Sequence, residues 1–95
     1  MPAVLITRFK DLTPEGHVIE LVVWRLPKPV PPSTHRFKYR AAYVVEGVRI
    51  VGFDNERGEG DYCDLRGREL PYAFTSVDQL VEDFGDAVSA ARGTT

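Results

Sequence analysis

The stretch "HRFKYRAAYVVEGVRIVGF", residues 35–53, carries the strongest secondary-structure signal in the chain. Aromatic and apolar side chains alternate with basic ones as far as Glu46-Gly47, and apolar residues follow. This pattern predicts two antiparallel strands joined by a two-residue turn. In the register that such a turn sets, the expected pairs are Val45 with Val48, Tyr43 with Ile50, Ala41 with Gly52, and Tyr39 with Asp54.

An acidic segment, "GFDNERGEGDYCD" at residues 52–64, overlaps the end of this hairpin and holds five carboxylates and three glycines. The predicted register places its start beside the basic residues that open the first strand. A solvated hairpin loop whose glycines supply positive φ is one interpretation, and a functional site is the other. Oxygen ligands of this kind suit Mg²⁺ or Ca²⁺. The spacing is not that of an EF-hand, because Glu59 stands where that loop needs glycine.

The N-terminal region predicts a second hairpin, formed by residues 4–9 and 17–26. The second of these segments is apolar on both alternating faces, which is typical of a central strand covered on both sides. Four of the seven prolines follow, between residues 27 and 32, and predict a stiff, extended connector.

The C-terminal part predicts one short, irregular strand within residues 62–74 and a helix over residues 76–91. Ser76 is placed to cap that helix. The expected class is therefore α+β: an antiparallel sheet of about five strands with one C-terminal helix packed on a face. The predicted buried stripe of the helix consists of Val77, Leu80, Val81, Phe84 and Val88.

Length and composition favour one domain, residues 1–95, with a small core. The single cysteine, Cys63, excludes an internal disulfide, and neither a signal peptide nor a membrane-spanning apolar run is present. We therefore expect a soluble, cytoplasmic protein with no membrane partner. Residues 1–53 hold eight Lys or Arg against four Asp or Glu, whereas residues 54–95 hold four against ten. Such asymmetry fits either a basic face that binds a polyanion or two oppositely charged halves packed together.

Of the two histidines, His35 is the one with basic and hydroxyl-bearing residues close to it in the sequence. Its neutral imidazole suits removal of the proton from a ribose 2'-hydroxyl, with Tyr39 or a carboxylate to orient the ring. The adjacent cations suit phosphate binding. These are the parts of a metal-independent ribonuclease, although a lone histidine at a strand entrance is also a common structural residue. The expected RNA-binding residues are Arg36, Lys38 and Arg40 of the strand and Arg57 of the acidic segment.

Three segments together resemble the TumE family: "LPKPVPPSTHRFKYRAAYV", "VGFDNERGEGDY" and "LPYAFTSVDQLVEDFGDAV". The resemblance spans nearly the whole chain. It implies the toxin component of a two-gene toxin-antitoxin module, with an antitoxin partner that carries a DNA-binding domain.

Functional residues follow from the resemblance position by position. Where family members carry a lysine and two histidines, this chain has Glu59, Tyr62 and Asp64, which leaves the chemistry of the second block open. The implied residues are His35, Lys38, Tyr39 and Arg40 in the first block and Asp54, Asn55, Glu56, Gly58, Gly60 and Asp61 in the second.

Two hypotheses remain at this stage. In the first, the toxin acts on RNA: His35 is the general base, Lys38 and Arg40 bind phosphate, and Asp54 or Asp61 positions the histidine or a Mg²⁺ ion. No metal is required if His35 is the base. In the second, the same charged edge binds an antitoxin, another protein or nucleic acid without catalysis. Exposed edge strands also make a homodimer or strand addition by the antitoxin plausible.

Overall fold

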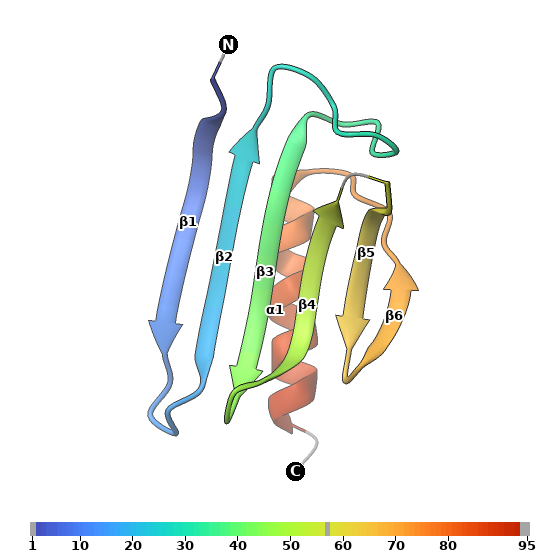
Figure 1. The fold of residues 1–95 in the computed structure, drawn as a ribbon. Coiled ribbons are helices and arrows are strands. Elements are labelled where there is room, and N and C mark those ends of the chain that lie inside the picture. The colour runs from blue at the N-terminus through green and yellow to red at the C-terminus, as the bar shows by residue number, and fades with distance from the viewer. Residues whose placement is uncertain (1, 57, 94–95) are drawn as a thin grey trace.

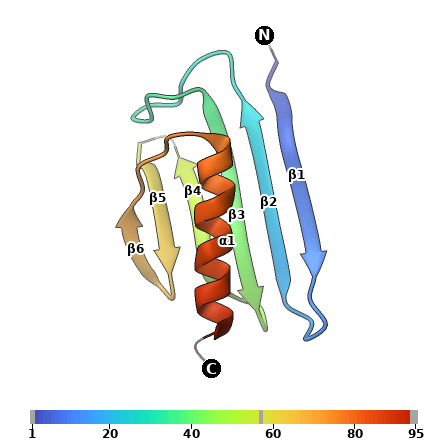
Figure 2. The same cartoon turned by 180° about the vertical axis from the view of Figure 1, so that it is seen from behind.

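The protein is a six-stranded antiparallel sheet with one helix on one of its faces, in a computed structural model that describes residues 2–56 and 58–93. The strands lie side by side in chain order, from β1 to β6 (Figure 1). Figure 2 shows the helix lying across β3 and β4 on the rear face. The elements are β1 (Val4–Leu12), β2 (Val18–Arg25), β3 (Phe37–Val45), β4 (Val48–Glu56), β5 (Gly60–Leu65), β6 (Arg68–Pro71) and α1 (Val77–Gly93).

The predicted α+β architecture is confirmed, with one strand more than the expected five. The extra strand arises because the segment expected to form one irregular strand forms two, β5 and β6. They are joined at Arg66 and Gly67, whose φ angles of 53° and 82° are both positive. Two positive φ values in succession give the tight turn that suits the twist of a hairpin. The sequence signal for this hairpin is weak because β6 has only four residues and ends in Pro71, so the alternation is too short to indicate a second strand.

The β3–β4 hairpin turns at Glu46 and Gly47, as predicted, and pairs Val45 with Val48. An irregularity between Tyr43 and Val44 then shifts the register by one residue. The predicted pairs beyond the turn were therefore wrong. The observed pairs are Tyr43 with Val51, Ala42 with Gly52, Ala41 with Phe53, and Arg40 with Asp54.

This shift decides which face of the sheet Asp54 occupies. Directly opposed residues of an antiparallel pair point to the same face. Tyr39 is buried under the helix at 1% exposure, whereas Arg40 is exposed on the other side, which we call the open face. Because Asp54 is opposite Arg40 rather than Tyr39, it lies on the open face.

The core lies between α1 and the rear face of the sheet and includes Val23, Ala41, Val51 and Leu80. α1 is capped as predicted, because the Gln79 amide donates to Ser76 Oγ at 3.1 Å. Of the predicted helical stripe, Leu80, Phe84 and Val88 are buried and Val77 is half-buried. Val81 is 43% exposed, so its placement in the core was wrong. One residue corresponds to about 100° of helical rotation, which turns Val81 away from the sheet.

β2 lies between β1 and β3, as expected of a central strand, but only one of its faces is fully covered. Leu21 and Val23 are buried on the helix side, whereas Trp24 is 36% exposed on the open face. The prediction that both faces are covered was therefore wrong. Within the described residues, no helix is long and apolar enough to cross a membrane.

Candidate functional site

The acidic segment is a strand pair rather than a loop. It forms the end of β4, a short turn and most of β5, and Gly58 and Gly60 have φ angles of 87° and 78°. The positive φ expected of these glycines is thus present, and side chains on either side of the turn alternate between the two faces. The carboxylates are therefore divided between the open face and the helix side.

The proline-rich connector between β2 and β3 packs against this turn. The Gly58 amide donates to the Pro31 carbonyl at 3.0 Å, and a Cβ atom at Gly60 would lie 3.1 Å from Pro32 Cγ. The absence of a side chain at Gly60 therefore permits the close approach. The connector brings Ser33 and His35, which are near its C-terminal end, to the start of β5.

Asp61, on the helix side of β5, accepts hydrogen bonds from three side chains, and we call these four residues the Asp61 cluster. Tyr39 Oη and His35 Nε2 each lie 2.6 Å from Asp61 Oδ2. Ser33 Oγ donates to Asp61 Oδ1. The Asp61 side chain is 11% exposed, so these bonds form in a largely dehydrated environment. They join the connector, β3 and β5 at one point.

Both ring nitrogens of His35 are engaged. The Phe37 amide donates to His35 Nδ1 at 3.1 Å, so Nδ1 carries no proton and Nε2 donates to Asp61. The ring also packs on Phe74, with centroids 4.1 Å apart. In this arrangement the imidazole has no lone pair available to a substrate proton.

The cluster perturbs the pKa values of its members. Burial alone would raise the pKa of Asp61, but hydrogen bonds from Ser33, Tyr39 and His35 outweigh it and lower the pKa below the usual range of a carboxyl. Burial, followed by the bond to Asp61, raises the pKa of Tyr39 far above its usual value. The ionised carboxylate and the neutral phenol are thus stabilised together.

Asn55 extends the β3–β4 pairing beyond its last backbone pair. Its side chain is among the most buried in the protein, and the residue is 1% exposed. Its Oδ1 accepts from the Tyr39 amide at 3.0 Å, and its Nδ2 donates to the Phe37 carbonyl at 2.7 Å. The side chain thereby provides hydrogen-bond partners for two backbone groups of β3 that lie beyond its last backbone pair with β4.

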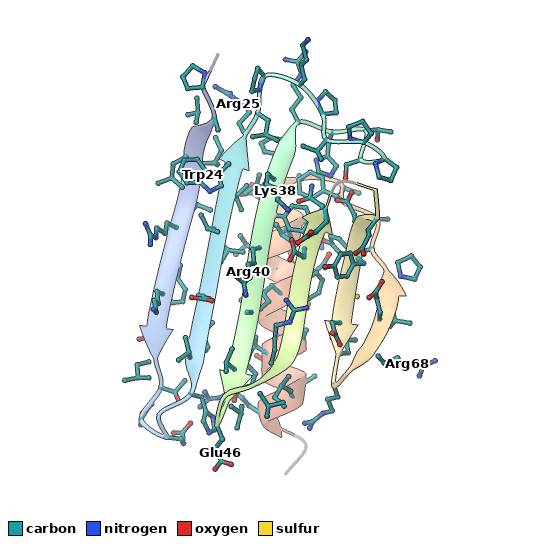
Figure 3. All side chains as sticks on the ribbon, in the orientation of Figure 1. Trp24, Arg25, Lys38, Arg40, Glu46 and Arg68 are labelled. Atoms are coloured by element: carbon teal, nitrogen blue, oxygen red, sulfur yellow. The ribbon has the colours of Figure 1, made fainter. Side chains whose placement is uncertain are left out.

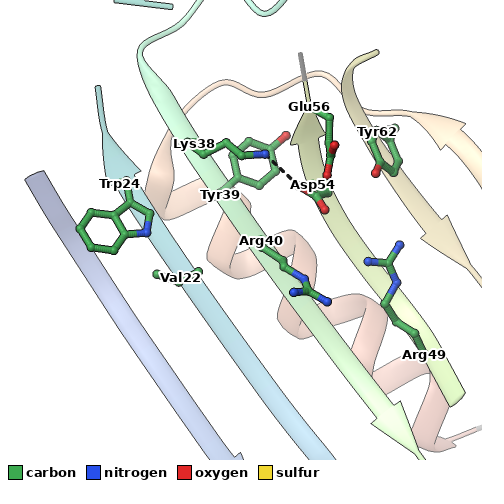
Figure 4. A pocket seen from close by; sticks show the side chains of 9 residues that line it. All are labelled: Val22, Trp24, Lys38, Tyr39, Arg40, Arg49, Asp54, Glu56 and Tyr62. Atoms are coloured by element: carbon green, nitrogen blue, oxygen red, sulfur yellow. Dashed lines mark hydrogen bonds and ion pairs between the residues drawn. The ribbon is translucent and has the colours of Figure 1, made fainter. Parts of the chain in front are cut away.

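The open face carries a concave pocket of about 520 Å³, here called the basic pocket (Figures 3 and 4). Lys38 Nζ lies 3.4 Å from Asp54 Oδ1 and also donates to the Asn55 carbonyl. Figure 4 shows Glu56 and Tyr62 beside Asp54 at one end and Trp24 at the other. The lining residues are Val22, Trp24, Lys38, Tyr39, Arg40, Arg49, Asp54, Glu56 and Tyr62.

Arg49 is a pocket residue that the sequence reasoning did not identify. Its guanidinium lies directly over Gly52, where a Cβ atom would be only 2.6 Å from Arg49 Cζ. Arg49 Nη2 is also 3.7 Å from Asp64 Oδ2, so the guanidinium forms an ion pair with β5. The sequence signal was the small pair Ala42 and Gly52 on the open face, visible only with the correct register.

The predicted site residues are thus brought to one end of the sheet but onto opposite faces. Lys38, Arg40 and Asp54 line the basic pocket, whereas His35 and Asp61 lie in the Asp61 cluster. Tyr39 belongs to both, since it lines the pocket and donates to Asp61. Of the remaining predicted residues, Arg36 lines a separate hollow with Arg25 and Pro27, and Arg57 lies outside the described residues.

The two carboxylates proposed for a metal do not converge. Asp54 is paired with Lys38 on the open face, and Asp61 accepts from three donors on the helix side. Among the described residues, no group of three or more His, Cys, Asp or Glu side chains is placed to hold a metal ion. The residues present therefore do not fit a shared Mg²⁺ site at Asp54 and Asp61.

Comparison with models of protein families identifies the family of this chain. The family model described as "Toxin TumE" matches residues 4–92, which is nearly the whole chain. Searches of curated proteins and of solved structures found no match. The chain therefore belongs to the TumE family, the toxin component of a toxin-antitoxin system, which implies a cognate antitoxin as its partner.

Proposed function

We propose that this toxin acts on cytoplasmic RNA as a ribonuclease and that the basic pocket is where the RNA binds. The observation that carries the proposal is the convergence of three cationic side chains, Lys38, Arg40 and Arg49, on one concave surface. Phosphate groups are the anions that such clusters bind most often, and arginine offers two parallel donors to them.

An aromatic residue completes the surface that a nucleotide needs. Phe37 and Tyr39 of β3 face the helix side, so β3 alone offers no stacking platform. Trp24 of the neighbouring strand lies on the open face at the edge of the same pocket. Its exposed indole can stack on a base while Arg40 and Arg49 hold the adjacent phosphates.

Glu56 is our proposed general base. It is an exposed carboxylate on the open face, beside Asp54 and Tyr62. It takes the 2'-hydroxyl proton, O2' attacks the phosphorus, and the bond from phosphorus to O5' breaks. The products are a 2',3'-cyclic phosphate and a 5'-hydroxyl protonated by solvent. Lys38 and Arg40 offset the negative charge that develops on the phosphorane.

The general-base role of His35 stays a prediction, and the contacts of the ring support another role. Its two nitrogens are already bonded to Phe37 and Asp61. Its place on the helix side also separates it from the pocket. We propose that His35, Tyr39 and Asp61 hold the strands beneath the pocket in position and that Asp54 positions Lys38.

The cognate antitoxin would neutralise the toxin by binding it, and from the family resemblance we propose that it carries a DNA-binding domain. The alternative function is binding without catalysis, in which the same cations bind a protein or a nucleic acid. Both functions need the cations, but only the ribonuclease needs Glu56.

Growth arrest on expression distinguishes these functions. We expect arrest with the wild type, loss of arrest with Glu56→Gln, and arrest retained with Glu82→Gln, a matched change on the exposed surface of α1. Circular dichroism of the purified variants checks that each is folded. Arrest that survives Glu56→Gln but not Arg40→Ala would favour binding without catalysis.

A further inference from the structure

β1 is the outermost strand of the sheet, and it is long and exposed. It has a neighbouring strand on one side only within the described chain, and eight of its nine residues are exposed. The opposite edge, β6, has only four residues and ends in Pro71, which makes it a poor template for a further strand. β1 is therefore the edge at which strand addition is physically favourable.

The two faces of β1 differ in chemistry. Phe9 is opposite Leu21, so it points to the helix side, where it is 51% exposed because α1 covers strands further along the sheet (Figure 2). Arg8 and Lys10 are opposite Val22 and Glu20, so they point to the open face. A strand beside β1 would thus meet an apolar side chain on one face and two cations on the other.

Pairing with a second copy of this chain is unfavourable at that edge in the registers that centre on its cations. In an antiparallel pair of β1 strands related by a twofold axis, opposed residues share a face. In registers centred on residues 8 to 10, Arg8 meets itself, Lys10 meets itself, or Arg8 meets Lys10. Like charges directly opposite each other destabilise a sheet. The edge is complementary to a strand with carboxylates where this one has cations.

We propose that β1 binds an extended segment of the cognate antitoxin by strand addition. The segment carries acidic side chains at alternate positions, opposite Arg8 and Lys10, and apolar side chains between them, over Phe9. Backbone hydrogen bonds to the free edge supply general affinity, and the alternating side chains fix register and face.

The position of this edge links docking to the basic pocket. Arg8 and Lys10 line a hollow on the open face together with Trp24 and Arg40, which also line the basic pocket. Glu20 is the single carboxylate among the described lining residues of that hollow. Carboxylates of a docked strand would therefore lie beside the proposed RNA path and repel its phosphates. This consequence rests on the proposed function, whereas the docking itself does not.

The test uses two synthetic peptides that match the nine residues of β1 in length. One alternates glutamate with valine, and its matched control alternates lysine with valine. Binding to the full-length protein is measured by fluorescence anisotropy, and hydrogen exchange locates the protected amides. We expect the acidic peptide to bind, to protect β1 amides, and to bind about tenfold more weakly to Arg8→Glu/Lys10→Glu. Arg68→Glu, at the opposite edge of the sheet (Figure 3), should leave binding unchanged.

Four outcomes would overturn the proposal. Equal binding of the lysine peptide would show that opposite charge does not determine binding. Protection from hydrogen exchange confined to elements other than β1 would show that the peptide does not add as a strand to this edge. If the protein is a dimer and its β1 amides are protected from hydrogen exchange without peptide, the partner at this edge is a second copy of the chain. Protection of β1 by a single-stranded RNA oligonucleotide but not by the acidic peptide would assign it to RNA. None of these readouts requires RNA cleavage, so failure here is distinguishable from failure of the proposed ribonuclease.

Discussion

Replacing Asp61 with asparagine tests the idea that the Asp61 cluster supports the fold beneath the basic pocket. The new amide can face Ser33, whose hydroxyl can turn to accept, while the remaining oxygen still accepts from His35 and Tyr39. What is lost is the negative charge. A hydrogen bond to a charged group contributes about 1.5–3 kcal/mol and one to a neutral group about 0.5–1.5 kcal/mol. All three bonds change from charged to neutral, which predicts a loss of about 3–4.5 kcal/mol in the free energy of unfolding.

Thermal and urea unfolding followed by circular dichroism measure this loss. In a domain of this size each kcal/mol lowers Tm by roughly 4–8 °C, so we expect a decrease of about 12 °C or more. The control is Asp83→Asn: Asp83 accepts from Tyr72 Oη at 2.6 Å and from an exposed Gln79 amide at 2.8 Å, so its loss should be smaller. If Asp61→Asn lowers the free energy of unfolding by less than Asp83→Asn does, the reasoning is refuted.

We also expect the difference in stability between the wild type and Asp61→Asn to depend on pH. Because folding lowers the pKa of Asp61, its ionised form contributes stability that is fully present above the unfolded carboxyl pKa, about 3.9. That contribution is lost as the pH falls through the lower pKa of the folded state. The stability difference between wild type and Asp61→Asn should therefore be constant near neutrality and shrink below about pH 4. A difference that stays constant down to pH 2 would mean that the charge is not what Asp61 contributes.

Further predictions concern the basic pocket. For single-stranded RNA, a plot of the log of the binding constant against the log of the salt concentration has a negative slope, and Arg49→Ala should make that slope less steep by about 0.7. An unchanged slope in this salt titration would place Arg49 outside the RNA site. Gly52→Ala should weaken RNA binding in the same titration with little change in Tm, because the new methyl displaces only the flexible Arg49 side chain. Trp24→Ala should cost about 1–3 kcal/mol of RNA binding free energy if the indole stacks on a base, whereas Val48→Ala, an exposed apolar control, should cost none in the same RNA titration.

Much of the fold could be predicted because local signals were consistent. The Glu46-Gly47 turn, the alternation along β3 and the Ser76 cap each follow from short-range rules, and each is present. The division of the C-terminal strand region at Arg66-Gly67 was missed because the strand that follows it, β6, has only four residues, of which only Leu70 and Pro71 are apolar, and so shows little alternation.

The site was harder to predict because one bulge decides which side chains share a face. Sequence alternation correctly brought the basic start of β3 to the acidic strand pair. It could not show that Asp54 faces Arg40 rather than Tyr39, which places two of the predicted carboxylates on opposite sides of the sheet. Arg49 and Trp24 were not identified because they come from parts of β4 and β2 that join the pocket only through the pairing of four strands.

The most direct test of the proposed function is incubation of the purified protein with a defined RNA, with Mg²⁺ and separately with a chelator, followed by mapping of the fragment ends. We predict cleavage that survives chelation, leaves 2',3'-cyclic phosphates and is lost in Glu56→Gln but not in Glu82→Gln. Intact RNA under both conditions would contradict the ribonuclease, and undiminished cleavage by Glu56→Gln would contradict its placement in the basic pocket.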